Sequence, residues 1–89
     1  MRQEADTRLD GNAIGGELLE LFGVEMTLAE GTCASCGNRA PMAEVDVFVH
    51  APGIVARCRG CESVLLRIVH GRDRTWLDVS GVRSLEIRR

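Results

Sequence analysis

Apolar residues near the start of the chain recur with the period of a helix. In residues 9–23, LDGNAIGGELLELFG, they follow the i, i+4, i+7, i+8 spacing of one helix face. These positions are Ile14, Leu18, Leu21 and Phe22. Glu17 and Glu20 fall on the opposite face. The pattern predicts an amphipathic helix of about three turns.

The ends of this helix and its weakest positions follow from single residues. Asp10 or Asn12 can cap its start, and Gly23 can end it. Gly15 and Gly16 each cost roughly 1 kcal/mol relative to alanine, so a helix this short is marginal alone and must dock. We expect it to cover the sheet of its own chain, with the paired glycines allowing another backbone to approach.

A strand with one buried face is predicted at residues 41–51, PMAEVDVFVHA, where apolar and polar side chains alternate. The face expected to be buried comprises Met42 or Ala43, Val45, Val47 and Val49, and the other face comprises Glu44, Asp46, Phe48 and His50. Pro52 and Gly53 mark a turn, after which residues 54–58 return. The two segments predict an antiparallel hairpin.

Residues 63–71, SVLLRIVHG, place apolar side chains on both sides of a strand. Val64, Leu66 and Ile68 face one way, and Leu65, Arg67 and Val69 face the other. We expect a central strand covered on both faces, by the helix or by a second copy of the chain. Residues 71–74 predict a turn into a strand at 75–79, and a last short strand is predicted at 82–87.

The chain has 89 residues, which make one small domain. We expect residues 1–8 to be flexible and residues 9–89 to form a single domain. The predicted class is α+β, with an antiparallel sheet of about five strands and one N-terminal amphipathic helix. A domain this small commonly needs a stabilising cross-link, such as a disulfide or a bound metal ion, in addition to its hydrophobic core.

The four cysteines are candidates for such a cross-link. They form two CxxC motifs, Cys33 and Cys36 in GTCASCGNRA and Cys58 and Cys61 in VARCRGCESV. The 21 residues between the pairs are one more than the usual range for a zinc site of this type. Two sulfurs on each of two tight turns can complete a tetrahedron around one Zn²⁺. The spacing predicts a zinc ribbon with one structural zinc ion and these four ligands.

The residues beside the cysteines refine this hypothesis. Gly37 follows the first pair and tolerates positive φ, whereas Glu62 stands at the equivalent position after the second pair. Glu62 would need a different local turn or some strain. His50 and His70 are interpreted as surface side chains at strand ends, because four thiolates already complete the coordination sphere.

Other uses of the cysteines stay open. Iron in a rubredoxin-like site, two disulfides or a CxxC redox pair would employ the same residues. Disulfides need an oxidising compartment, yet residues 1–12, MRQEADTRLDGN, contain no apolar signal segment. No run approaches the ~18 apolar residues of a membrane span. We therefore expect a cytoplasmic protein with no membrane contact.

The formal charge of −2 is unevenly distributed. Residues 1–32 hold two arginines against seven acids, a balance of −5, and residues 33–89 hold nine arginines against six acids, a balance of +3. Zinc bound by four thiolates would lower the total by about two further units. Every basic side chain is arginine, which a codon bias explains more simply than phosphate recognition does.

Several stretches carry a resemblance to a known family. They are LDGNAIGGELLELFGVEMT, CASCG, APGIVARCRGC, VLLRIV and RTWLDVSG, and they cover most of residues 9–87. On these stretches the chain resembles an uncharacterised family of small bacterial proteins, found mainly in actinobacteria and classed as a domain of unknown function with a zinc ribbon. The resemblance implies a cytoplasmic zinc-ribbon fold of the whole chain with Cys33, Cys36, Cys58 and Cys61 as ligands. It implies no activity.

The favoured function is a non-enzymatic interaction module in which zinc fixes the ribbon. The helix and the strand at residues 63–69 would present an apolar surface to a protein partner or to a second copy. An enzyme is disfavoured, because a closed four-cysteine site leaves no position for water or substrate on the metal. His50 and Asp46 share a strand face, which a solvated strand edge explains. We expect no small-molecule substrate.

The alternative function is a nucleic-acid-binding zinc ribbon associated with transcription or translation. Its candidate contacts are Arg39, Arg57, Arg59, Arg67, Arg72 and Arg74. Attraction to the anionic metal centre explains the three beside the cysteines equally well. Proteins that bind single strands also stack bases on aromatic rings. This chain has only Phe22, Phe48 and Trp76, and two of these are expected in the core.

Overall fold

The computed structural model of the chain describes residues 9–50 and 53–88. The segment 1–8, predicted to be flexible, and Pro52 of the predicted turn lie outside the described residues. In chain order the elements are β1 (Leu9–Asp10), a 3₁₀ helix (Gly11–Ile14), α1 (Gly15–Phe22), β2 (Glu30–Cys33), β3 (Arg39–Pro41), a second 3₁₀ helix (Met42–Glu44), β4 (Asp46–His50), β5 (Gly53–Arg57), β6 (Val64–His70), β7 (Thr75–Asp78) and β8 (Val82–Glu86).

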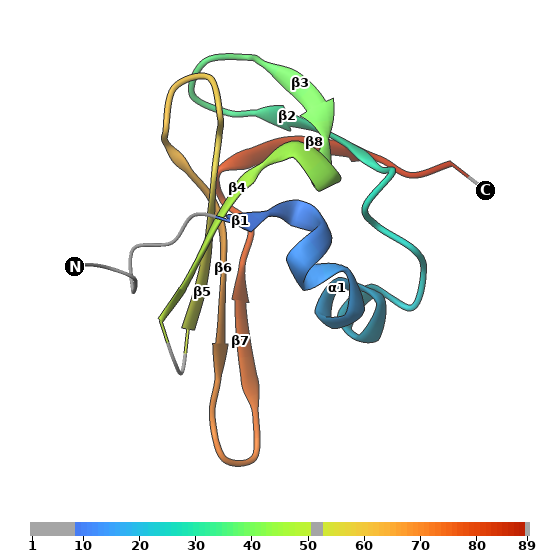
Figure 1. Cartoon of the computed structure of the whole chain (residues 1–89), viewed down its shortest axis with the longest axis vertical. Helices are drawn as coiled ribbons and strands as arrows, with labels where there is room; N and C mark the ends of the chain where they lie inside the picture. Colours follow the sequence, from blue (N-terminus) through green and yellow to red (C-terminus); the bar gives the residue numbers. More distant parts are fainter. Residues whose placement is uncertain (1–8, 51–52, 89) are drawn as a thin grey trace.

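The strands pair into two antiparallel sheets (Figure 1). The larger sheet has the order β1-β4-β5-β6-β7, and the smaller sheet has the order β3-β2-β8. The predicted α+β class is confirmed, and so are the hairpin β4–β5 and the strands β7 and β8. Strands β1, β2 and β3 are additional to the prediction. Strand β8 leaves the larger sheet and pairs with β2, which creates the second sheet.

The helical segment has about the predicted length, but only its last eight residues form an α-helix. Its first turn is the 3₁₀ helix, which Asp10 caps by accepting a hydrogen bond on Oδ1 from the Asn12 amide at 3.1 Å. Gly23 ends α1 with φ 75°, and its amide donates to the Leu19 carbonyl at 2.8 Å. Leu21, expected on the buried face, is 37% exposed, because the eight-residue helix contacts the sheet along a narrower stripe.

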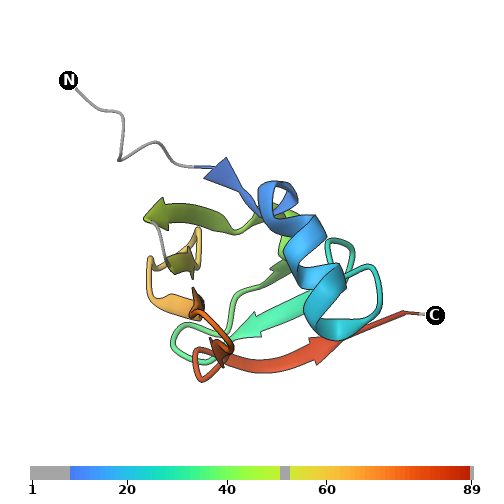
Figure 2. The same cartoon turned by 90° about the horizontal axis from the view of Figure 1, so that it is seen from below.

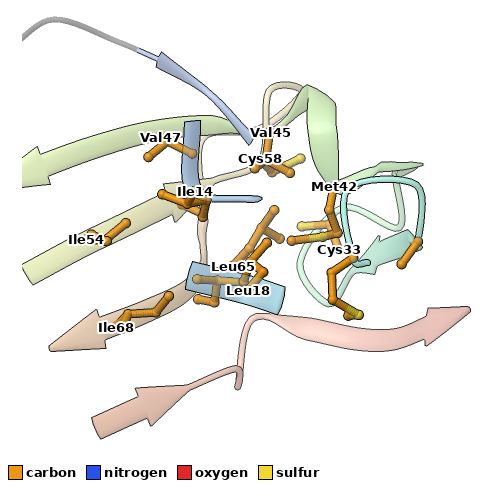
Figure 3. Close-up of a cluster of buried hydrophobic side chains, with 14 residues drawn as sticks. Ile14, Leu18, Cys33, Met42, Val45, Val47, Ile54, Cys58, Leu65 and Ile68 are labelled. Atoms are coloured by element: carbon orange, nitrogen blue, oxygen red, sulfur yellow. The ribbon is translucent and has the colours of Figure 1, made fainter. Parts of the chain in front are cut away.

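One hydrophobic core lies between α1, the inner face of the larger sheet and the smaller sheet (Figure 3). Ile14 and Leu18 enter it from the helical segment, and Val47, Ile54 and Ile68 enter it from three adjacent strands. Phe22 packs against this core from the end of α1. The helix therefore covers the sheet of its own chain, as expected.

The strand predicted from residue 41 begins five residues later, because Met42–Glu44 forms a 3₁₀ helix. Val45 and Val47 are buried as predicted, whereas Val49 is 46% exposed at the end of β4. Asp46, expected on the polar face, is only 6% exposed. Its Oδ1 lies 3.3 Å from Nε of Arg59, so this buried carboxylate forms a salt bridge with an arginine of the second CxxC loop.

Strand β6 is central, between β5 and β7, but only part of it is covered on both faces. Leu65 is buried as well as Leu66 and Ile68, because the chain at Gly81 passes directly over the start of the strand. Further along, Arg67 is exposed and Val69 is half-buried. The expectation of two covered faces is therefore wrong for the second half of β6.

Two glycines permit close backbone contacts. A Cβ at Gly11 would lie 1.7 Å from the Met42 carbonyl oxygen, and one at Gly81 would lie 1.9 Å from that of Val64. The pair Gly15 and Gly16, expected to admit a second backbone, does not. A Cβ on Gly15 would lie 3.2 Å from Cγ2 of the Thr27 side chain, and nothing lies within 4 Å of a Cβ built on Gly16.

We therefore expect Gly11→Ala and Gly81→Ala each to lower the free energy of unfolding by about 3 kcal/mol, because backbone must shift to admit the methyl group. The control is Gly16→Ala on the exposed side of α1, which should be neutral or stabilise by up to about 1 kcal/mol. Urea unfolding followed by circular dichroism measures all three. Equal stability of Gly11→Ala and Gly16→Ala would contradict the packing described.

Candidate metal centre

The sulfur atoms of the four cysteines converge on one site. All four Sγ atoms lie within 4.8 Å of one another. Cys33 and Cys61 have their sulfurs 3.7 Å apart, and so do Cys36 and Cys58. None of the four is disulfide-bonded. The structure thus brings together the residues that the sequence singles out, although the pairs lie far apart in the chain.

Each CxxC motif forms the loop of a hairpin, and the two hairpins belong to different sheets. Cys33 is the last residue of β2, and its loop leads into β3 of the smaller sheet. Cys58 follows β5 directly, and its loop leads into β6 of the larger sheet. The cluster therefore lies where the two sheets meet, and Figure 3 shows two of its members, Cys33 and Cys58, at the border of the core.

The two loops share one backbone geometry. The amide of Gly37 donates to the Cys33 carbonyl at 2.9 Å, and the amide of Glu62 donates to the Cys58 carbonyl at 2.8 Å. Gly37 has φ 79° and Glu62 has φ 67°. Of the two options for Glu62, the structure shows strain rather than a different turn, because a residue with a Cβ adopts the left-handed conformation.

Backbone amides point at two of the sulfurs. The amide of Asn38 donates to Cys36 Sγ at 3.4 Å, and that of Gly60 donates to Cys58 Sγ at 3.3 Å. The hydroxyl oxygen of Ser63 lies 3.3 Å from Cys61 Sγ. Such donors favour the thiolate over the thiol and orient it for a cation.

The acidity of the thiols differs across the cluster. Hydrogen bonds from the Ser63 hydroxyl and amide lower the pKa of Cys61 to about 6. At Cys36 the Asn38 amide acts to lower the pKa, but desolvation and the thiols of Cys61, Cys58 and Cys33 outweigh it and raise the pKa to about 11. Without a cation Cys36 therefore keeps its proton near neutral pH, and binding a divalent ion to all four sulfurs must displace that proton.

The donor set and its spacing fit a tetrahedral metal ion. Zinc–sulfur bonds of about 2.3 Å place the sulfurs of a regular tetrahedron roughly 3.8 Å apart. The two closest pairs, at 3.7 Å, match this edge, and the 4.8 Å limit admits some longer edges. Cys33 and Cys58 are buried, whereas Cys36 and Cys61 are exposed, so an ion would sit at the surface of the core.

The other polar residues considered from the sequence lie outside the cluster. His70 Nε2 is 3.0 Å from Glu17 Oε2 on α1, and His50 is exposed at the end of β4. Arg39 pairs with Glu30 at 2.7 Å and also with Glu86. Neither histidine belongs to the cluster.

A cleft of about 320 Å³ borders the buried side of the cluster, and sequence patterns do not reveal it. Two of its walls are Cys33 and Cys58. Its remaining walls combine apolar and polar side chains with glycine backbone, namely Gly31, Asn38, Arg39, Ala40, Met42, Glu44, Val45, Arg59, Gly60, Leu65 and Val82. It arises where the two sheets meet, so no local sequence signal could have indicated it.

Comparison with protein families matches residues 3–89 to a family of unknown function, DUF6510. The chain belongs to this family. The resemblance noted in the sequence is thereby confirmed for nearly the whole chain, while the bacterial origin stays a prediction. No curated protein and no solved structure matches the chain. Among the described residues, no helix has the length and apolar character to cross a membrane.

Proposed function

We propose that the protein is a non-enzymatic binding module built around one structural Zn²⁺ ion, with Cys33, Cys36, Cys58 and Cys61 as ligands. The observation that carries this proposal is the convergence of four sulfurs within 4.8 Å from two hairpins. Four thiolates in tetrahedral arrangement are typical of structural zinc. Iron takes the same ligands in rubredoxin-like sites, so metal analysis must decide between them.

Within this proposal the ion supplies a cross-link between the two sheets. The residues of the chain position the ligands: the Asn38 and Gly60 amides orient Cys36 and Cys58, and the left-handed residues Gly37 and Glu62 close the loops. Because the fourth ligand is also a cysteine, no coordination position remains for a substrate or water. That argument supports a structural role rather than catalysis.

Removing the metal tests the structural role. We expect one zinc ion per chain by elemental analysis, and we expect exhaustive chelation to unfold the domain, because metal binding and folding share one free energy. Cys36→Ser and Cys58→Ser should lose both the metal and the folded circular dichroism spectrum. The control is Ser35→Ala, an exposed residue of the first loop, which should retain both. A metal-free protein that stays folded would contradict the proposal, and so would iron in place of zinc.

A cytoplasmic location is part of the same proposal. Zinc requires reduced, deprotonated cysteines, and a reducing compartment maintains them. The unpaired state of all four thiols supports this location.

We further propose that the module contacts a protein partner, which is either a different protein or a second copy of the chain. Four apolar side chains on α1 and the loop that follows it are exposed, namely Leu19, Leu21, Val24 and Leu28. Leu28 is the most exposed at 77%, and Leu19 is 46% exposed. Strand β6 can contribute only side chains, because β5 and β7 occupy both of its edges.

Sedimentation over a wide range of concentrations tests self-association. We expect the zinc-loaded protein to dimerise. The double variant Leu19→Ser/Leu28→Ser should shift toward the monomer with little loss of stability, since neither side chain belongs to the core. Val79→Ser, which changes an exposed valine in the loop after β7, is the control and should still dimerise. A wild-type protein that stays monomeric throughout would reject the second copy as partner.

A further inference from the structure

The face of the larger sheet that points away from α1 is the outer face, defined by Phe48, Val55, Arg67, Val69 and Trp76. These residues alternate along their strands with inner-face residues such as Val47, Ile54, Ile68 and Leu77. Figure 2 shows α1 on one side of the larger sheet, and no described element packs against the other. The outer face is thus open over its central strands.

The strand register places the outer-face side chains in two adjoining rows. In one row Phe48 lies beside Val55, Val55 lies beside Arg67, and Arg67 lies beside Asp78 on β7. In the other row Val69 lies between Gly53 and Trp76. The face therefore offers two aromatic rings on an apolar floor, with a gap where Gly53 has no side chain.

Trp76 is the most prominent feature of this face. Trp76, the only tryptophan of the chain, is 56% exposed and takes no part in the core. The Arg74 guanidinium lies 5.8 Å from the ring centroid. The expectation that two of the three aromatic residues lie in the core is wrong: Phe22 packs against the core, while Phe48 and Trp76 belong to the outer face.

Charge is segregated between the two sides of the molecule. Strands β5, β6 and β7 with the turn at 71–74 carry four arginines, Arg57, Arg67, Arg72 and Arg74, against two aspartates, Asp73 and Asp78. Residues 15–30, which include α1, carry four glutamates and no basic residue. Positive charge therefore accumulates on the strands that bear the aromatic rings, in a chain whose formal total is −2.

We propose that the outer face binds single-stranded nucleic acid, with bases stacked on Trp76 and Phe48 and phosphates contacted by Arg57, Arg67 and Arg74. Aromatic rings beside arginines on an open sheet are the combination that single-strand binders use, because every base has a face that can stack. The bound nucleic-acid strand would run across β4, β5, β6 and β7, along the two rows of side chains described above.

Charge favours this occupant over a second copy of the chain. If two outer faces packed together, the net positive charge of one would repel that of the other. A polyanion would instead neutralise the positive charge of a single face. The side of the molecule that bears α1 is acidic and would repel a polyanion, so the arginines of the outer face supply the attraction and the affinity falls as salt rises. A second copy that docked its acidic helix side on the outer face is the competing arrangement, which the test below separates.

The test measures anisotropy of a labelled oligouridylate of about 16 nucleotides titrated with the zinc-loaded protein. We expect Trp76→Leu to weaken binding roughly tenfold or more and Phe48→Leu to weaken it less, because Phe48 is half-buried. Arg67→Gln/Arg74→Gln should lower the slope of log affinity against log salt by about 1.4. The matched control is Arg83→Gln on β8 of the smaller sheet, which should change nothing.

Several outcomes would overturn the proposal. They are absence of binding at low salt, equal affinity for duplex DNA, whose bases are not free to stack, and an Arg83→Gln effect as large as that of Arg67→Gln. Loss of self-association in Trp76→Leu, without nucleic-acid binding by the wild type, would assign the face to a second copy. The inference rests on the proposed zinc-held fold, so zinc content and circular dichroism of each variant are measured first. A folded, zinc-loaded protein that fails to bind refutes this inference alone.

Discussion

The architecture depends on four thiols that two hairpins bring to one point. Strands β2 and β3 deliver Cys33 and Cys36, while β5 and β6 deliver Cys58 and Cys61, and these hairpins belong to different sheets. Four thiolates this close repel one another, so a proton or a cation must reside among them. A divalent ion held by all four sulfurs would relieve that repulsion and join the two sheets. The hydrophobic core of so small a domain contributes little stability, so a cross-link of this kind would add to the stability of the contact between the two sheets.

The sequence predicts this centre well because its signal is local. CxxC spacing and the glycine at position 37 report the loop geometry directly, and the strained Glu62 shows that the ligand geometry prevails over backbone preference. An alternating pattern likewise locates β4, the turn signal at Gly53 locates β5, and an apolar run with side chains on both faces locates β6. The predicted strand boundaries and buried faces are wrong where tertiary contacts determine the local structure. Met42 lies in a 3₁₀ helix packed against Gly11, and Leu65 is buried by the chain at Gly81.

The second sheet and the open face are not predictable in this way. Strands β2 and β3 are short, and pairing of β8 with β2 depends on contacts distant in the chain. Strand β7 shows why apolar residues are a weak guide to burial in a small domain. Leu77 on the inner face is 38% exposed because α1 is too short to cover the sheet edge, and Trp76 is exposed because it lies on the outer face, away from α1. The same shortage of covering elements leaves the outer face available for a ligand.

The central claim is that one zinc ion binds all four sulfurs. X-ray absorption at the zinc edge of the purified protein measures its ligands directly. The account predicts four sulfur neighbours at about 2.3 Å and no nitrogen or oxygen ligand. A shell with fewer than four sulfurs, completed by water or histidine, would contradict it, because the site would then have an open position and a capacity for chemistry that this account denies.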